Sequence, residues 1–180
     1  YVTAIQRAIY KLVMTENNPT QAAWLSDALN WRFLFNSQQS GIGIDSIYAY
    51  FAAPETSLLR PPGLPNRAEV LGGSQLFLRY LAQRAGSETI RALYLTPGGI
   101  DAIDTVLAEN EVLDPVTGIP VTARDIFADF VITNMINLPF GDGRYVYPGV
   151  ELDRQRLARA TLVEDISEPV SFPGEVVPPF

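Results

Sequence analysis

The sequence of 180 residues contains no cysteine and no histidine. Without cysteine, the chain can form no disulfide, no thiolate nucleophile and no cysteine-ligated zinc or iron–sulfur site. Without histidine, it lacks the commonest metal ligand and the commonest general base near neutral pH. We therefore expect no cofactor and no bound metal.

Basic residues are scarce as well: 13 Lys and Arg stand against 20 Asp and Glu, which gives a formal net charge of −7. A nucleic-acid-binding surface needs clustered cations to neutralise phosphates, and the few here are spread from Arg7 to Arg159. We expect neither nucleic acid nor an anionic membrane as a ligand. No apolar run approaches the roughly 20 residues of a transmembrane segment, so none is expected.

Apolar residues make up 47% of the chain and charged residues only 18%. This composition is sufficient for a packed core and is not typical of a disordered chain. The low charged fraction indicates a surface that is partly neutral or covered by neighbouring domains or partners. The chain begins at Tyr1 without a signal-peptide pattern, and we interpret it as a piece of a longer or processed protein.

Apolar residues recur mostly at helical spacing, so the fold class is predicted to be mainly α, a bundle of about six helices. The first helix carries Ile5, Ile9 and Leu12 at this spacing, Thr20 is expected to cap the second, and Ser87 and Thr122 to cap later ones. Residues 1–147 are expected to form the helical domain, and residues 148–180 an extended C-terminal tail. The helices are predicted at residues 2–15, 20–41, 45–52, 73–85, 87–95, 100–108 and 122–135.

The connections between these helices are predicted from proline and glycine. Residues 54–70 should form a loop because four prolines in it interrupt regular hydrogen bonding. Its Pro-rich part, residues 54–65, is either a polyproline II surface for a partner or, as we favour, a rigid connector. Gly86 is placed to end a helix, and residues 114–118 form a turn, with 141–143 and 145–148 extended. Four acids are interpreted as surface charges on helices: Asp101, Asp104, Asp125 and Asp129.

Three segments in this order resemble the helical half of the catalytic domain of gluzincins, the thermolysin-like zinc metallopeptidases. The segments are GGSQLFLRYLAQRAG (72–86), SETIRALYLTPGGIDAIDTVLA (87–108) and DIFADFVITNMI (125–136). The likeness reaches about Tyr147, and the end of the chain, VSFPGEVVPPF, resembles the entry into a β-sandwich domain. The resemblance implies that a β-rich half completes the cleft, and it implies an extracellular or cell-envelope location in a bacterial protein.

In gluzincins, one helix carries His-Glu-x-x-His, with two zinc ligands and the general base, and the next helix carries a glutamate as third ligand. Trp24-Leu25-Ser26-Asp27 resembles the second motif, and counting back twenty residues places the first at Thr3 to Arg7. The resemblance implies that Thr3 and Arg7 replace the histidines, Ala4 the general base, and Asp27 the glutamate.

Several further interpretations stay open at this stage. Arg7 and Asp27 form an ion pair at the former metal position, or each is a separate surface charge. The aromatic residues Tyr10, Trp24 and Trp31, like Tyr80, line a cleft or, as we favour, pack in the core. Glu69 is a further cleft candidate. It could also form a carboxylate pair with Asp27 for acid–base chemistry, an interpretation that we do not favour.

The sequence as a whole predicts a catalytically inactive, metallopeptidase-like domain with a binding or structural role in a larger secreted protein. Its partner would be a protein or peptide, or a neighbouring domain of its own longer chain. One alternative is a subunit of a cell-envelope or membrane-associated assembly. Another is a hydrolase with metal-free carboxylate chemistry.

Overall fold

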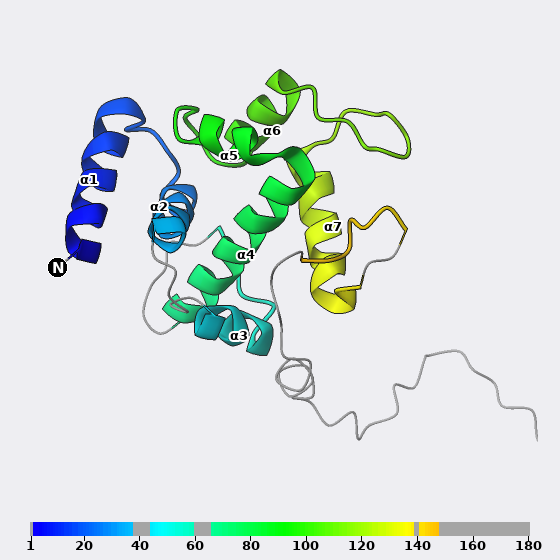
Figure 1. The fold of residues 1–180 in the computed structure, drawn as a ribbon, viewed down its shortest axis with the longest axis horizontal. Helices are drawn as coiled ribbons and strands as arrows, with labels where there is room; N and C mark the ends of the chain where they lie inside the picture. The colour runs from blue at the N-terminus through cyan, green and yellow to red at the C-terminus, as the bar shows by residue number, and fades with distance from the viewer. Residues whose placement is uncertain (1, 38–43, 60–65, 139–140, 148–180) are drawn as a thin grey trace, which may run out of the picture.

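The structure is a computed structural model that describes residues 2–37, 44–59, 66–138 and 141–147. At residues 2–4, 6, 7, 15 and 34–37 it describes the backbone alone. The described residues contain seven helices, so the mainly α fold is confirmed (Figure 1). Each of the seven predicted ranges overlaps one of them, although the total was put at about six. The helices are α1 (Val2–Asn17), α2 (Ala23–Ser37), α3 (Ile44–Ala52), α4 (Arg67–Ala85), α5 (Ser87–Leu93), α6 (Ile100–Glu109) and α7 (Ala123–Ile136).

Helix α4 lies at the centre of the molecule and contacts four other helices, namely α2, α3, α5 and α7 (Figure 1). It can do so because its buried residues surround the helix instead of forming one stripe, which is the pattern of a central helix. The buried residues of α4 are Val70, Leu71, Gly72, Gly73, Ser74, Gln75, Leu76, Phe77, Leu78, Tyr80 and Leu81.

Helix α4 starts at Arg67, six residues before the predicted start at Gly73. Residues 67–70 were predicted as the end of a loop because of the prolines before them, and this part of the prediction was wrong. The structure shows why glycine is needed: a Cβ atom at Gly72 would lie 1.8 Å from the backbone oxygen of Ser46 in α3. A Cβ at Gly73 would lie 2.5 Å from Leu58 Cδ2. The two glycines therefore let α3 approach the α4 backbone closely.

Helix α1 was predicted correctly, but its apolar stripe does not face the core. Ile5, Ile9 and Leu12 are more than half exposed, whereas Tyr10 and Met14 on another side of the helix are buried. Among the described side chains of α1, Tyr10 and Met14 are the buried ones. The apolar stripe of α1 is left uncovered by the described residues.

Two predicted helix caps were wrong. Helix α2 begins at Ala23, and its first backbone hydrogen bonds end on the carbonyl oxygen of Ala22, so Thr20 lies in the preceding turn. Ser87 is the first residue of α5 and not its cap, because Gly86 occupies that position with a φ of 85°. Gly86 therefore both ends α4, as predicted, and starts α5.

The turn at residues 114–118 and the cap of α7 are confirmed. The backbone N–H of Asp114 donates to the carbonyl of Ile119, and Leu113 and Pro120 form an antiparallel bridge. The Thr122 hydroxyl accepts from the Asp125 backbone N–H, while the Asp125 carboxylate accepts from the Thr122 N–H. This reciprocal capping box defines the start of α7. Residues 141–146 are turns and a bend instead of the extended chain predicted there, and the predicted tail lies outside the described residues.

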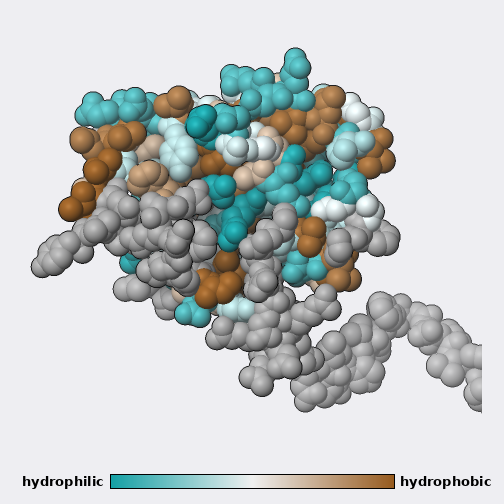
Figure 2. All heavy atoms as spheres, in the orientation of Figure 1, coloured by the Kyte–Doolittle hydropathy of each residue, from teal (hydrophilic) through white to brown (hydrophobic). Residues whose placement is uncertain are grey.

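Most of the large apolar side chains that remain exposed on helices belong to α1 and α7. The exposed side chains of α1 form an apolar surface at the left of Figure 2, where Figure 1 shows α1 in the same orientation. In α7, Phe127, Val131 and Met135 follow one another at four-residue spacing and are all exposed. Among the described helices, none combines the length and the apolar character that crossing a bilayer would need.

Candidate functional site

The replaced catalytic positions of the resemblance lie on two neighbouring helices. Thr3, Ala4 and Arg7 belong to α1, where only their backbone is described, so the predicted ion pair of Arg7 with Asp27 lies outside the described side chains. Asp27 belongs to α2 and is half-buried. Helices α1 and α2 contact each other directly.

Tyr10 sets the register between these two helices. Its hydroxyl donates a hydrogen bond of 2.8 Å to the backbone oxygen of Ser26, the residue before Asp27. Its ring packs edge-on against Tyr94, with 6.1 Å between the ring centres. Burial raises the pKa of Tyr10 well above its usual range, and the charge of Asp27 is among the smaller influences in the same direction. Tyr10 therefore remains a neutral hydrogen-bond donor close to Asp27.

The other predicted cleft residues do not gather around one cavity. Trp24 is buried in the core and also lines a cavity that is described below, whereas Trp31 is half-buried on α2. Tyr80 is fully buried, as the core interpretation predicted. Glu69 lies in the first turn of α4, and its Oε2 atom is buried without a hydrogen bond in the described part of the chain.

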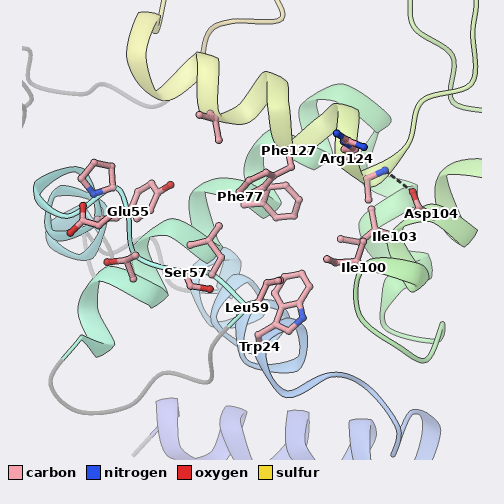
Figure 3. Close-up of a pocket in the computed structure, with 16 residues that line it drawn as sticks. Trp24, Glu55, Ser57, Leu59, Phe77, Ile100, Ile103, Asp104, Arg124 and Phe127 are labelled. Carbon is pink, nitrogen blue, oxygen red and sulfur yellow. Dashed lines mark hydrogen bonds between the residues drawn. The ribbon is translucent and has the colours of Figure 1, made fainter. Parts of the chain in front are cut away.

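A cavity of about 440 Å³ lies between the start of α2, the connection after α3, and helices α4, α6 and α7 (Figure 3). This volume falls within the range of roughly 300–1,000 Å³ that is typical of small-ligand sites. Most of its wall is apolar or aromatic, and no residue of α1 contributes. The lining residues are Trp24, Tyr50, Pro54, Glu55, Thr56, Ser57, Leu58, Leu59, Phe77, Ile100, Ile103, Asp104, Ala123, Arg124, Phe127 and Val131.

The turn between α1 and α2 positions Trp24 in the wall of this cavity. The backbone N–H of Ala22 donates to the carbonyl of Gly98 over 2.7 Å, and the amide of Asn18 donates to the carbonyl of Thr96 over 3.0 Å. These bonds hold the start of α2 against the loop between α5 and α6. A Cβ at Gly99 would lie 3.3 Å from the indole nitrogen of Trp24, so glycine permits this close contact.

The opposite wall is held by hydrogen bonds between tyrosines and Asn134 of α7. The Asn134 amide donates to the hydroxyl of Tyr50 over 3.3 Å, and the hydroxyl of Tyr147 donates to the Asn134 side-chain oxygen. Burial raises the pKa of Tyr50 to about 12, so its hydroxyl is neutral at physiological pH. Tyr50 thus contributes a fixed, uncharged aromatic wall.

Three charged side chains and one indole N–H supply most of the polarity of the cavity. Asp104 accepts the backbone N–H of Ala123 over 2.6 Å, which anchors the start of α7 to α6. Glu55 and Arg124 make no ion pair within the described residues and lie on opposite sides of the cavity in Figure 3. The indole N–H of Trp24 has no hydrogen bond in that part of the chain. This arrangement is suited to binding a ligand with an apolar body and polar ends.

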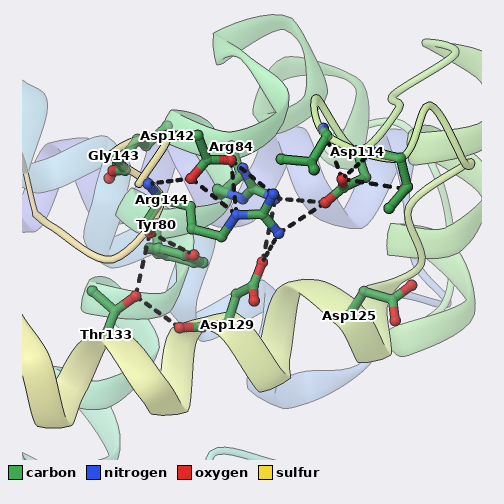
Figure 4. Close-up of polar contacts among 12 residues, drawn as sticks. Tyr80, Arg84, Asp114, Asp125, Asp129, Thr133, Asp142, Gly143 and Arg144 are labelled. Atoms are coloured by element: carbon green, nitrogen blue, oxygen red, sulfur yellow. Dashed lines mark hydrogen bonds and ion pairs between the residues drawn. The ribbon is translucent and has the colours of Figure 1, made fainter. Parts of the chain in front are cut away.

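A second, smaller cavity of about 300 Å³ is bordered by a charge cluster (Figure 4). Arg144 contacts Asp114 at 2.8 Å and Asp142 at 2.7 Å, and Arg84 of α4 contacts Asp129 of α7 at 3.2 Å. The cluster joins segments that are far apart in sequence. Asp129 is therefore a structural ion-pair partner and not the free surface charge that we predicted.

Hydrogen bonds set the charge states in this cluster. Bonds from the Thr117 backbone N–H and from Arg144 hold the pKa of Asp114 well below its usual range. The bond from Arg144 also lowers the pKa of Asp142. Because Asp114 and Asp142 are held in the ionised form and paired with Arg144, the cluster is suited to holding the fold together and not to proton transfer.

The sequence did not identify most of the cavity residues. Glu55 and Leu59 belong to the Pro-rich segment that we interpreted as a connector, and Asp104 was interpreted as a surface charge. Trp24 was predicted as a candidate cleft residue, and only because it is aromatic. Within the described residues, no group of three or more acidic side chains is placed to hold a metal ion.

Comparison of the chain with family models, with curated proteins and with solved structures finds no match in any of the three.

Proposed function

We propose that this chain is a catalytically inactive, metallopeptidase-like module that serves a binding or structural role. The proposal starts from the resemblance to gluzincins, in which Thr3, Ala4, Arg7 and Asp27 occupy the positions of the zinc ligands and the general base. An extracellular or cell-envelope setting, and a protein or peptide as partner, follow from the same resemblance. The resemblance to the helical half of that catalytic domain is likewise part of the proposal.

The observation that carries the proposal is the contact of Tyr10 with Ser26. The resemblance requires the helix with the first motif to pack beside the helix with the third ligand. Tyr10 lies three residues after Arg7, and Ser26 directly precedes Asp27. Because residues three apart share a helix face, the 2.8 Å hydrogen bond supports the register that pairs these two positions.

The replaced residues cannot perform zinc-dependent hydrolysis. Zinc in a peptidase needs three protein ligands and acidifies its bound water to a pKa of about 7. Asp27 offers one carboxylate, whereas Arg7 brings a permanent positive charge to the place of a cation. Ala4 has no atom that could accept the proton of the attacking water. Because these residues exclude zinc-dependent hydrolysis, we propose a role in binding or structure.

A structural role in a larger assembly is the second candidate, and the exposed stripe on α1 favours it. Ile5, Ile9 and Leu12 are between 52% and 64% exposed and lie on one helix, so they form a continuous apolar surface. Contiguous apolar surface of this kind is typical of a face that another domain or subunit covers. Copurification from the native source would separate a stable assembly partner from a transient peptide ligand.

Restoring the zinc ligands tests the proposed register. A variant with Thr3→His, Arg7→His and Asp27→Glu would recreate two histidines at i and i+4 and a glutamate on the next helix. We expect it to bind one zinc ion per chain, measured by inductively coupled plasma analysis and by competition with a zinc-binding dye.

The matched control carries Ile5→His, Ile9→His and Asp27→Glu. Its histidines have the same spacing but lie on the exposed side of α1. Zinc should bind the restored variant about ten-fold or more tightly than the control, because only there can a third ligand reach the ion. Equal affinities would show that the register is wrong. Stoichiometric zinc or peptide-bond hydrolysis in the natural chain would refute the proposed inactivity.

A further inference from the structure

We infer that the 440 Å³ cavity binds a short peptide segment that places one large apolar side chain between a basic and an acidic group. This inference rests on the proposed binding role and adds the site and the ligand class. The site is separate from the replaced catalytic positions because neither Asp27 nor any described residue of α1 lines the cavity, although Trp24 belongs to the same helix as Asp27.

The wall of the cavity fits an apolar side chain. Trp24 and Phe77 are buried in it, while Leu59, Ile100 and Phe127 are roughly half exposed, so the apolar surface continues from the interior to the mouth. Phe77 and Phe127 meet edge to face with their ring centres 6.0 Å apart. An inserted aromatic or branched side chain would remove this surface from water, which is the main source of affinity in such pockets.

The indole N–H of Trp24 offers a donor to a ligand with a hydrogen-bond acceptor. Trp24 lines the cavity, and its indole nitrogen is not among the buried side-chain atoms that lack a partner in the described part of the chain. A tryptophan N–H can only donate, so it is complementary to an acceptor. A peptide carbonyl at the cavity would accept from it, whereas a pure hydrocarbon would not.

The charges around the cavity distinguish a peptide from a fatty acid. Glu55 stands on one side and Arg124 on the other, with Asp104 also in the lining (Figure 3). A fatty acid would match Arg124 but would leave Glu55 on the other side without a counter-charge. A segment with a basic group towards Glu55 and an acidic group towards Arg124 matches both sides. The net charge of −7 also favours a ligand that carries at least one cation.

A peptide titration of the full chain tests the inference. The probe is the blocked peptide acetyl-Lys-Gly-Phe-Gly-Glu-amide, and binding is followed through the indole N–H signal of Trp24 in NMR spectra. The only other tryptophan, Trp31, serves as the internal reference because it does not line the cavity. We expect the Trp24 signal to shift with saturation, while the Trp31 signal stays in place.

Three further probes define the ligand chemistry. Replacing Phe by Ala in the peptide should weaken binding roughly ten-fold or more, because the apolar contact is lost. Peptides with Lys at both ends or Glu at both ends should bind about two- to five-fold more weakly than the mixed peptide. Decanoate is the fatty-acid probe, and tighter binding of decanoate than of the peptide would overturn the inference.

Variants that fill the mouth locate the site. Val131→Trp and Leu59→Trp place a large side chain there from opposite elements, and each should weaken peptide binding about ten-fold or more. The control is Val116→Trp, at a residue that is 73% exposed and outside the cavity, and it should leave binding unchanged. Two well-folded mouth variants that bind normally would overturn the assignment.

The result separates this inference from the proposed function. No binding of the mixed peptide to the natural chain overturns the inference. The proposed inactive module would then still stand on the zinc experiment, which reports on α1 and α2. If the peptide binds but the restored variant does not bind zinc, the peptide site in the cavity would stand. The alignment of α1 and α2 with the zinc-ligand positions of metallopeptidases would then be refuted.

Discussion

At the scale of single residues, two adjacent glycines control the distance between α3 and α4. Gly72 faces a backbone oxygen of α3, whereas Gly73 faces the side chains of Leu58 and Tyr50. Backbone cannot move aside without displacing the whole helix, but the end of a leucine side chain can rotate. The two positions therefore tolerate a methyl group to different degrees.

We expect Gly72→Ala to lower the free energy of unfolding by at least about 2 kcal/mol, because overpacking a close contact costs about 1–3 kcal/mol or more. Gly73→Ala should cost less, because its added methyl group meets the end of the Leu58 side chain, which can rotate, and not backbone atoms. Urea denaturation of both variants measures the difference. Equal losses would mean that α3 does not approach α4 as closely at Gly72 as the structure shows.

At the scale of helices, sequence periodicity located the elements but not always their buried sides. Residues 2–15 and 45–52 were predicted as helices from the spacing of apolar residues, and both predictions agree with the structure within two residues. The apolar stripe of α1 nevertheless points away from α2. Periodicity shows that one side of a helix is apolar, but it does not show whether this chain or a partner covers that side.

The start of α4 was missed for a related reason. The prolines up to Pro65 favoured a loop through residue 70, whereas α4 already begins at Arg67. The close contacts of this helix, at Gly72 with Ser46 and at Gly73 with Leu58, involve residues 15 to 26 positions earlier in the chain. Short-range sequence patterns contain no information about such a contact. The Thr122 cap, by contrast, depends on a residue three positions away, and it was predicted correctly.

We expect Thr122→Ala to destabilise the chain by about 1 kcal/mol, because it removes the hydroxyl that accepts the Asp125 N–H. Thermal unfolding followed by circular dichroism measures the change. Thr105→Ala is the control, since Thr105 lies within α6, is exposed and bonds only to the carbonyl one turn earlier. An equal loss in both variants would show that the capping box contributes no more than an ordinary helical threonine.

The candidate cavity lies between elements, and this explains why the sequence did not reveal it. Its walls come from the start of α2, the connection after α3, and helices α4, α6 and α7. Glu55 and Arg124 are 69 positions apart in the sequence, so no spacing rule connects them. The replaced metal positions, in contrast to the cavity residues, could be proposed from the sequence because a known motif has a fixed spacing of residues.

At the scale of the whole molecule, the charge cluster makes stability depend on pH. Arg84 and Arg144 join carboxylates from the turn at Asp114, from α7 and from the turn at Asp142. The pKa of Asp114 and that of Asp142 are lower in the folded chain than in the unfolded chain. Below the unfolded value of about 3.9, the unfolded chain therefore binds more protons than the folded one.

We expect stability from this cluster to be fully present above about pH 4 and to be lost as the pH falls through the folded pKa values. In Asp114→Asn, the urea midpoint should be lower at pH 7 and should fall less steeply between pH 4 and pH 2. Glu111→Gln is the control, because Glu111 is exposed and makes no ion pair within the described residues. A parallel pH profile in Asp114→Asn and the natural chain would contradict this role.

Tyr147 has a practical consequence for shortening the protein. Its side chain is buried against Tyr80 and Phe130, and its hydroxyl donates to Asn134, so it belongs to the packed body. The backbone oxygen of Arg144 also accepts the Tyr80 hydroxyl. A truncation placed just after α7 would expose that body and would delete Arg144, the shortest ion-pair contact of Asp114, whereas a minimal folding unit has to extend through position 147.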